Sequence, residues 1–484
     1  MKSDRTSCTL RTASSLLCFI LLLGGCSLFQ PSPRLEPVAP LPEAFTLYSD
    51  GELDRGKWWE AFGSDELNSM VEEALVANLD IKQAWARLRQ LGAKAEQSSA
   101  DKYPTLDMTG GYSHSSTYDA DTKKEKQAED HSVGLKAGYE VDLWGRIQAM
   151  AASGDLDYLA SREDLNASAM TVASEVVQRW LEIQTQRKKK RILTEQLKAN
   201  TTYLELIELR FRNSIATALD VYQQRQNVAR VSALLPPVKS QEQLLLHELA
   251  LLMGKPVGSV VVADADLPEL APLPGLGLPA DLLANRPDVR SSGMALSSAD
   301  WSVAAARANR LPSLNLTGTG EFSGTMLNTI FNNWALGLAA SVVGPIFDGG
   351  YRKAEVEKAR GVVDQRLAEY KETVYTAFKE VEDALVREKW QKEYIKARTI
   401  QIEAARTSLR EAVSRYTQGL DDYLPVLNAL LSEQELELSM ADEQTDLLLY
   451  RVALHRALGG TWVNGLTQPV PDKEIADDNT SNEG

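Results

Sequence analysis

Apolar residues recur at helical intervals in the first folded part of the chain. From Val71 to about Ala100 they follow one another in steps of three or four, which is typical of a helix that buries one face. Ser64 or Asp65 stands before this run as a candidate N-cap, because a short polar side chain there can accept a hydrogen bond from the first helical turn. We therefore expect a helix from this point to about Ala100.

The hydrophobic period changes from near 3.6 to 2 at Pro104. Apolar and polar residues alternate over 105–112 and again over 132–142. This alternation predicts a β-hairpin over 105–142, with two strands of about ten residues each, one apolar face and one polar face. The segment 119–130 is densely charged and is expected to be the loop between the strands.

The same alternation returns over 313–347 and predicts a second hairpin, with a loop around Gly324. The run 334–347 could alternatively be a transmembrane helix. That alternative fails because a spanning helix needs about 20 apolar residues, whereas this run is shorter and contains Gly344-Pro345. A strand is the better interpretation.

A long helix is expected after each hairpin. No glycine or proline occurs between Gly154 and Asn213, and a helix over that segment would be about 90 Å long at 1.5 Å per residue. Two adjacent apolar stripes run along it, which favours a helix packed between two neighbours. The stripes are Val172, Val176 and Trp180, and Ala173, Val177 and Leu181.

A return helix is expected after each long one, at about 220–253 and 425–458, so that the helix pairs occupy 144–253 and 350–458. Pro236-Pro237 lies in the first return helix, where the missing N–H groups predict a kink in that repeat only.

The chain contains an internal duplication. Asp80 aligns with Asp288 and Pro104 with Pro312, in both cases 208 positions apart; Arg210 aligns with Arg415, 205 positions apart. The three-residue difference is expected in a loop between these blocks, where length changes are tolerated best. The repeats are assigned to 58–255 and 280–465, with a Pro/Gly-rich linker at 256–279.

The first 25 residues are typical of an export signal, with a basic start and an apolar stretch. This segment ends in Leu23-Gly24-Gly25-Cys26, which resembles a bacterial lipobox, and Ser27 in place of Asp favours the outer membrane by the same resemblance. Cys26 is then the lipidated first residue, followed by a Pro-rich tether over 26–57; an ordinary signal peptide is the alternative. The tail, 466–484, has few apolar residues and is expected to be disordered.

Charge and composition exclude several classes of function. A net charge of −15 over 484 residues argues against nucleic acid, which requires a basic face. His247-Glu248 lacks the second histidine of a metalloprotease motif, and Gly254-Lys255 lacks the other residues of a phosphate loop. The four histidines show no ligand spacing, and there is no G-x-S-x-G elbow. The expected protein is not an enzyme and needs no cofactor beyond the covalent lipid on Cys26.

The predicted strands suit a membrane β-barrel, in which segments of about 9–11 residues alternate lipid-facing and polar side chains. A soluble β-sandwich is the alternative. Four strands cannot close a barrel, and an open edge in lipid costs several kcal/mol per unpaired backbone group. Three chains would supply twelve strands, which are enough for closure.

With these features the chain resembles the TolC-like outer-membrane efflux family, in its lipoprotein branch of resistance-nodulation-division systems. The resemblance rests on four motifs taken together: 278–289, Trp58-Trp59-x-x-Phe62, 142–146, and the paired Arg210-Phe211 and Arg415-Tyr416. It implies a mainly α fold with a membrane β-barrel. It also implies a homotrimer, in which twelve strands form the barrel in the outer-membrane lipid and twelve helices form a barrel in the periplasm. It also implies a periplasmic adaptor protein and an inner-membrane pump as partners. A non-conducting lipoprotein scaffold is the alternative.

The resemblance places the pore gate in the turn after Arg415-Tyr416, at Asp421, Asp422 and Tyr423. In the first repeat the corresponding turn has Ala216 and Thr217 in place of the two aspartates. Three copies would therefore form a three-fold acidic ring in a pseudo-six-fold tunnel, which favours cations. Asp421 is the first choice for facing the axis, while one of the two carboxylates is expected to cap a helix.

Overall fold

The computed structural model describes residues 29–31, 39–47 and 56–468. The chain folds into two compact units. Unit 1 comprises residues 1–38, 87–162 and 291–371, and unit 2 comprises 39–86, 163–290 and 372–484. Four of the five boundaries between the units fall within helices. Cys26, the export signal and the segment 469–484 lie outside the described residues.

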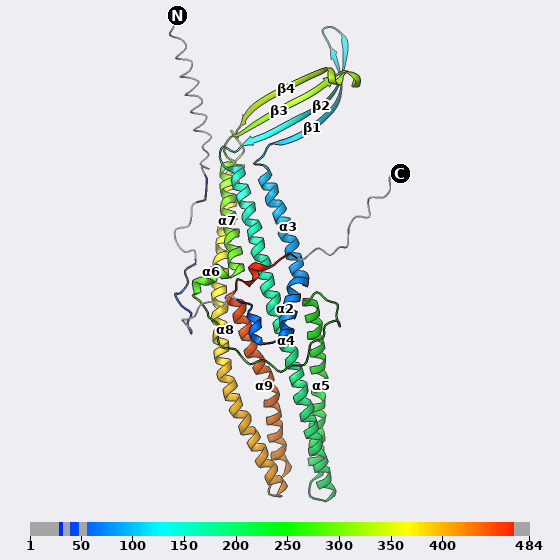
Figure 1. The fold of residues 1–484 in the computed structure, drawn as a ribbon, viewed down its shortest axis with the longest axis vertical. Helices are drawn as coiled ribbons and strands as arrows, with labels where there is room; N and C mark the ends of the chain where they lie inside the picture. Colours follow the sequence, from blue (N-terminus) through cyan, green and yellow to red (C-terminus); the bar gives the residue numbers. More distant parts are fainter. Residues whose placement is uncertain (1–28, 32–38, 48–55, 469–484) are drawn as a thin grey trace, which may run out of the picture. The chain divides into compact units, whose positions relative to one another are not determined.

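Unit 1 contains one antiparallel sheet of four strands in the order β1-β2-β3-β4, drawn in Figure 1. The strands are β1 (Thr105–Asp119), β2 (Lys124–Val141), β3 (Ser313–Gly324) and β4 (Asn333–Val343). Leu106 pairs with Ala137, Tyr139 with Leu316, and Leu314 with Val342. Because side chains alternate along a strand, this register places the alternating apolar residues predicted for the four strands on one face. The segment 333–343 is therefore a strand, as predicted.

The first hairpin is longer than predicted. Residues 119–130 were expected to be a loop, but β1 has 15 residues, β2 has 18, and the ladder ends with Asp119 opposite Lys124. Strand β2 pairs with β3 only from His131 onward, so the remainder is a two-stranded extension. Main-chain pairing requires no apolar face, and charged side chains on an exposed ribbon remain hydrated. The apolar–polar alternation therefore predicted only the part of the hairpin that belongs to the four-stranded sheet.

The helices repeat with the spacing read from the sequence. Helices α4 (Arg146–Arg212) and α8 (Tyr351–Thr417) each have 67 residues and begin 205 positions apart. Strands β1 and β3 begin 208 positions apart, so the three-residue difference lies between the start of each hairpin and the start of the long helix that follows it. The other elements are η1 (Trp58–Phe62), α2 (Asp65–Ala77), α3 (Leu79–Ala100), α5 (Ala218–Leu252), η2 (Pro279–Asp281), α6 (Leu282–Asn285), α7 (Pro287–Ala308), η3 (Leu327–Asn332), α9 (Tyr423–Leu458) and η4 (Trp462–Gly465). Helix α5 is continuous through Pro236 and Pro237.

The helix expected up to Ala100 is interrupted at Asn78. Ser64 is the N-cap of α2, as predicted, and its Oγ accepts from the Leu67 N–H at 3.2 Å. Buried Asn78 ends α2; its Oδ1 accepts from the N–H groups of Asp80 and Ile81, which caps α3. Its Nδ2 donates to the Leu252 carbonyl at 2.8 Å. Apolar spacing continues across this break, so periodicity could not reveal it.

The core of unit 2 lies along the long helices. Both stripes predicted on α4 are buried; Ala173, Val177 and Leu181 are fully inaccessible. The linker is bound to the helices by Arg451, which donates to the carbonyls of Ala271 and Pro272 at 2.8 and 2.7 Å and forms a buried ion pair with Glu388 at 2.8 Å. A buried pair of this kind tolerates loss of either partner poorly.

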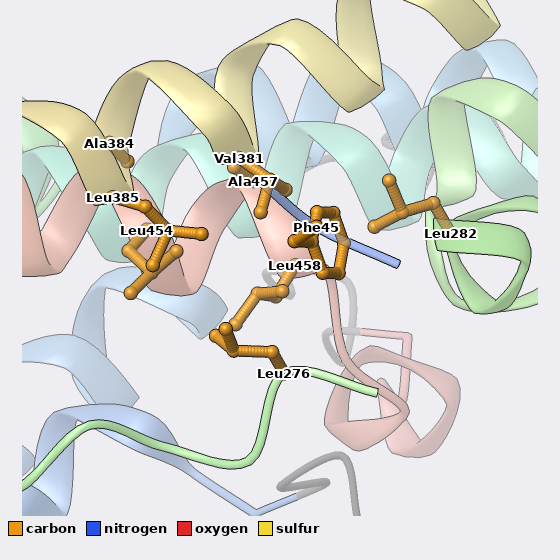
Figure 2. Close-up of a cluster of buried hydrophobic side chains, with 9 residues drawn as sticks. All are labelled: Phe45, Leu276, Leu282, Val381, Ala384, Leu385, Leu454, Ala457 and Leu458. Carbon is orange, nitrogen blue, oxygen red and sulfur yellow. The ribbon is translucent and has the colours of Figure 1, made fainter. Parts of the chain in front are cut away.

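Part of the predicted tether also packs in this core. The Phe45 ring lies among Leu282, Ala457 and Leu458 in Figure 2. The Thr46 N–H donates to Glu382 Oε1 at 2.7 Å. Residues 39–47 are thus fixed on unit 2, because an aromatic side chain in a Pro-rich segment gains more from burial than from exposure.

Candidate functional site

Asp421 and Asp422 lie in the turn 418–422 between α8 and α9, and Tyr423 is the first residue of α9. Ala216 and Thr217 lie in the corresponding turn, 213–217, between α4 and α5. The two turns have the same backbone hydrogen bond: the Ile215 N–H donates to the Arg210 carbonyl at 2.8 Å, and the Leu420 N–H to the Arg415 carbonyl at 3.0 Å. Ser214 and Gly419 hold equivalent left-handed conformations, with φ of 60° and 73°. The duplication therefore preserved the turn itself.

The first turn uses its polar groups to cap a helix. Thr217 is the N-cap of α5; its Oγ1 accepts from the Asp220 N–H at 3.2 Å, and the Asp220 carboxylate accepts from the Thr217 N–H at 2.8 Å. This reciprocal arrangement satisfies two backbone donors at the start of the helix. Ala216, beside it, is half-buried and contributes no polar group.

The second turn carries two aspartates in different situations. Arg415 donates to both oxygens of Asp421, at 2.6 and 3.1 Å. This hydrogen-bonded contact lowers the pKa of Asp421 and raises the pKa of Arg415. Asp422 occupies the N-cap position of α9 but makes no side-chain cap. Its carboxylate is exposed and has no hydrogen-bond or ion-pair partner in the part of the chain that the structure describes.

The missing cap on Asp422 has a local cause. Asp422 corresponds to Thr217, and Pro425 corresponds to Asp220 at the same offset of 205. Proline has no N–H group, so the donor that Thr217 uses in the first turn does not exist in the second. Of the two carboxylates, Asp422 is therefore left available for a partner, whereas Asp421, preferred from the sequence, is held by Arg415.

Tyr423 lies in the interior of the tip and not on its surface. Its side chain is 1% exposed, and its Oη donates to Gln224 Oε1 at 2.7 Å. The Tyr416 ring packs against it with centroids 5.4 Å apart, and the Arg210 guanidinium lies 4.4 Å from the Tyr416 centroid. Burial raises the pKa of Tyr423. Tyr423 thus joins α9 to α5 and does not line an aperture in this conformation.

A buried network of amides continues from Tyr423 and was not found from the sequence. Gln224 Nε2 donates to the Asn200 carbonyl at 2.8 Å, and Asn227 Nδ2 to Asn200 Oδ1 at 2.6 Å. Asn200 Nδ2 in turn lies 3.2 Å from Gln434 Oε1 on α9. All four amides are at most 3% exposed. Such groups are stable in a core because each is hydrogen-bonded.

A signal for this network exists in retrospect. Gln196 and Asn200, and likewise Gln224 and Asn227, are neighbours one turn apart on their helices, so each pair occupies one helical face. Uncharged amides on one face of otherwise charged helices can mark a polar contact between helices. Single-sequence periodicity counts them as surface positions.

Two of the four histidines have structural partners. His455 is buried and stacks on Trp58 with centroids 5.3 Å apart, and His114 Nδ1 lies 3.4 Å from Glu129. Within residues 29–31, 39–47 and 56–468, no group of three or more His, Cys, Asp or Glu side chains could hold a metal ion. In the same ranges, no helix combines the length and apolar character required to cross a membrane.

Comparisons with known proteins agree on one class. A family model described as outer membrane efflux protein matches residues 70–255 and 278–460. The chain is 32% identical over 470 residues to the pyoverdine export outer membrane protein OpmQ of Pseudomonas aeruginosa, covering 93% of this chain and 96% of that protein. It is 26% identical to the cation efflux system protein CusC of Escherichia coli, covering 92% and 98%.

Solved structures give the same result. A crystal structure of CusC superposes with a TM-score of 0.82 at 25% identity, covering 90% of this chain and all of that one. The outer-membrane channel OprN superposes with a TM-score of 0.85 at 25% identity and the same coverage.

Proposed function

Because the chain belongs to the outer membrane efflux protein family, it is an outer-membrane channel component of an efflux pump, and we propose that three copies form its passive duct. In this trimer the sheets close into a twelve-stranded barrel in the outer membrane, and the long helices form a twelve-helix periplasmic tunnel. A periplasmic adaptor protein and an inner-membrane pump complete the assembly. The relatives' names refer to pyoverdine and to cations, so the proposed cargo is a small molecule.

The observation that carries the proposal is the sheet with one apolar face and two unpaired edges. Strand β1 pairs only with β2, and β4 only with β3, among the described residues. In lipid, each unpaired backbone group on such an edge would cost several kcal/mol. Joining β4 of one copy to β1 of the next satisfies both edges, and three copies of four strands close the ring.

The dimensions of the sheet support a spanning role. Strands β3 and β4 have 12 and 11 residues. At about 3.3 Å per residue and a tilt of about 40°, they would span roughly 28 Å, close to the apolar band of about 25 Å around outer-membrane barrels. Trp334 lies near one end of the apolar face and Tyr139 near the other, and both are exposed in the single chain. Aromatic residues at both margins are typical of membrane interfaces.

The helices also have exposed apolar faces that a single chain does not cover. On α8, Trp390 and Ile400 are 62% and 72% exposed; on α5, Leu244 and Leu251 are 50% and 65% exposed. In unit 2, α9 contacts α4 through Thr185–Thr445, α8 through Arg451–Glu388 and α5 through Tyr423–Gln224. We propose that α8 of one copy packs against α5 of the next.

The gate follows from the trimer and the second turn. Three copies of Asp422 would converge near the axis, while the corresponding Thr217 residues contribute no charge. The proposed pore is cation-selective and mostly closed, as expected for a carboxylate ring at a constriction. Asp421 supports this ring by keeping Arg415 occupied, so that the Arg415 cation does not neutralise Asp422.

The lipid anchor is proposed at Cys26. Phe29 and Pro31, close after it, line a cavity of about 390 Å³ in unit 1 with Val303 and Val363. Intact mass spectrometry should show a triacyl increment on a chain that begins at Cys26; an unmodified thiol there would refute the assignment.

Two measurements test the proposed duct. Analytical ultracentrifugation in detergent should give a trimer, and planar-bilayer recording should show cation-selective conductance. The competing function, a non-conducting scaffold, predicts a folded protein without conductance. A stable folded monomer would contradict the barrel closure.

A further inference from the structure

One end of the sheet carries a group of cations. Strands β1 and β3 begin at this end and β2 and β4 finish there, as Figure 1 shows, because Thr105 pairs with Gly138 and Ser313 with Val343. All of this lies within unit 1. The cations adjoin these strand ends and are called the junction cations: Lys102, Arg307, Arg310, Arg352 and Lys353.

None of the junction cations has a carboxylate partner among the described residues. The neighbouring acids are already engaged: Glu140 pairs with Arg146 at 2.8 Å, Asp142 accepts from the Gln148 N–H at 2.8 Å, and Asp348 accepts from the Gly350 N–H at 2.9 Å. Asp101 is the exception and makes no such contact in that part of the chain.

Several exposed cations on α8 pair with acids one turn away, as Arg366 does with Glu369 at 2.8 Å and Lys396 with Glu393 at 2.6 Å, whereas the five junction cations are grouped at one end of the sheet. In a chain with a net charge of −15, a cluster of cations without acidic partners is a local excess of positive charge. It would attract an anion supplied from outside the chain.

Large apolar side chains are exposed beside the junction cations. Ile346 and Phe347 are fully or nearly fully exposed, at 103% and 92%, and Tyr351 is 68% exposed. Trp144 is held at the same level, because its Nε1 donates to the Pro312 carbonyl at 2.7 Å. Aromatic rings and cations together match the boundary between lipid headgroups and acyl chains.

A cavity at this end could receive a headgroup. It has a volume of about 210 Å³ and is lined by Trp144, Arg146, Arg352 and Val343, among others. Glu140 and Asp142 also line it, but their oxygens already accept from Arg146 and the Gln148 N–H. Arg352 is therefore the cation in this cavity without a carboxylate partner among the described residues. The strands contribute Glu140, Ser313 and Val343 from the polar face to this cavity and Val141 from the apolar face.

We propose that the junction cations bind an anionic phospholipid of the periplasmic leaflet. The phosphate would contact Arg352 and the neighbouring Arg310 and Lys353, while the acyl chains would lie on the apolar face of the sheet. This inference rests on the proposed function, since it requires the sheet to cross the outer membrane with its helical end toward the periplasm.

The test is native mass spectrometry of the full-length protein released from nanodiscs that contain equal amounts of phosphatidylglycerol and phosphatidylcholine. The native protein should retain phosphatidylglycerol preferentially. The variant Arg310→Gln/Arg352→Gln/Lys353→Gln should lose about 100-fold in apparent affinity, at roughly five-fold for each cation near a membrane surface. The control is Lys198→Gln/Lys239→Gln/Arg410→Gln, which removes the same charge from unit 2 and should retain the preference.

Three further comparisons separate the outcomes. Arg310→Lys/Arg352→Lys keeps the charge and should keep the preference, so a loss there would point to misfolding. Inorganic phosphate should not displace the lipid; displacement would identify a site for free phosphate and overturn the proposal. An intact trimer without phosphatidylglycerol preference would also overturn it, whereas absence of the trimer would refute the proposed function instead.

Discussion

The turns 213–217 and 418–422 share one backbone path but differ in side-chain chemistry. In the first, Thr217 and Asp220 close a capping box. In the second, Pro425 removes the donor that the box requires, Asp421 is bound by Arg415, and Asp422 is exposed without a partner. The Tyr423 side chain fills the interior of the second turn, whereas the corresponding residue in the first is Ala218.

This difference shows how a duplicated structure can acquire a new property at one copy only. The backbone hydrogen bonds keep both turns in place, so side chains can change without loss of the turn. Carboxylates then occur at alternate turns of the proposed trimer. A three-fold charge pattern would result from a nearly six-fold arrangement of backbones.

The largest expected difference between the two turns is the loss of stability when Tyr423 is replaced. Tyr423→Ala should reduce stability by about 3–5 kcal/mol, the usual cost of deleting a large buried aromatic side chain. Tyr423→Phe should cost about 1–3 kcal/mol, because Gln224 Oε1 loses its donor in the core. Chemical denaturation in detergent measures both, and Ala218→Ser at the equivalent, exposed position should have almost no effect. Equal effects at the two positions would contradict the different roles of the turns.

The acidic pair can be removed without disturbing the core. Asp421→Ala/Asp422→Ala should weaken cation selectivity and alter the resting conductance, because the proposed ring loses its charge. Planar-bilayer recording measures both quantities, and Ala216→Ser in the other turn is the matched control. Unchanged selectivity and conductance in the double variant would rule out this gate.

Removal of the capping box should have a smaller effect on stability, and here the first turn should be the more sensitive of the two. Thr217→Ala should destabilise the protein by about 1 kcal/mol, since the α5 start loses its side-chain cap. Asp422→Ala, at the equivalent position, should leave stability nearly unchanged because Asp422 caps nothing. Denaturation midpoints compare the two, and a larger loss for Asp422→Ala would show that the second turn is capped after all.

The smallest effect concerns pH. The pKa of Asp421 is lowered by its hydrogen bonds to Arg415. A lowered folded-state pKa means that the contact is present above the ordinary aspartate value of about 3.9 and is lost as pH falls through the folded value. The Asp421–Arg415 pair should therefore stay formed between about pH 7 and 5, and the conductance should show no transition caused by its loss in that range. A transition in that window that disappears in Asp421→Asn would contradict the assignment.

Local sequence patterns predicted much of the fold. Period-two alternation marked the four-stranded part of the sheet, and the absence of glycine and proline after Gly154 marked one very long helix. The duplication predicted that the helices would recur at an offset of 205, as α4 and α8 do. These features depend on neighbouring residues, so a single sequence contains them.

Other features required the tertiary structure. The Asn78 side chain at the break between α2 and α3 donates to the carbonyl of Leu252, which is distant in sequence. The buried amides around Asn200 and the docking of Phe45 likewise depend on partners from other helices. Patterns based on spacing cannot distinguish a polar residue facing water from one facing another polar residue in a core.

The gate shows the same division most clearly. The sequence by itself determined that carboxylates occur in one turn of each duplicated pair, because the aligned repeats place Asp421 and Asp422 opposite Ala216 and Thr217. Only the tertiary structure decided that Tyr423 is interior, that Asp421 is held by Arg415 and that Asp422 has no partner. The physical reason is that composition fixes which charges are present, whereas the path of the chain fixes which of them are neutralised.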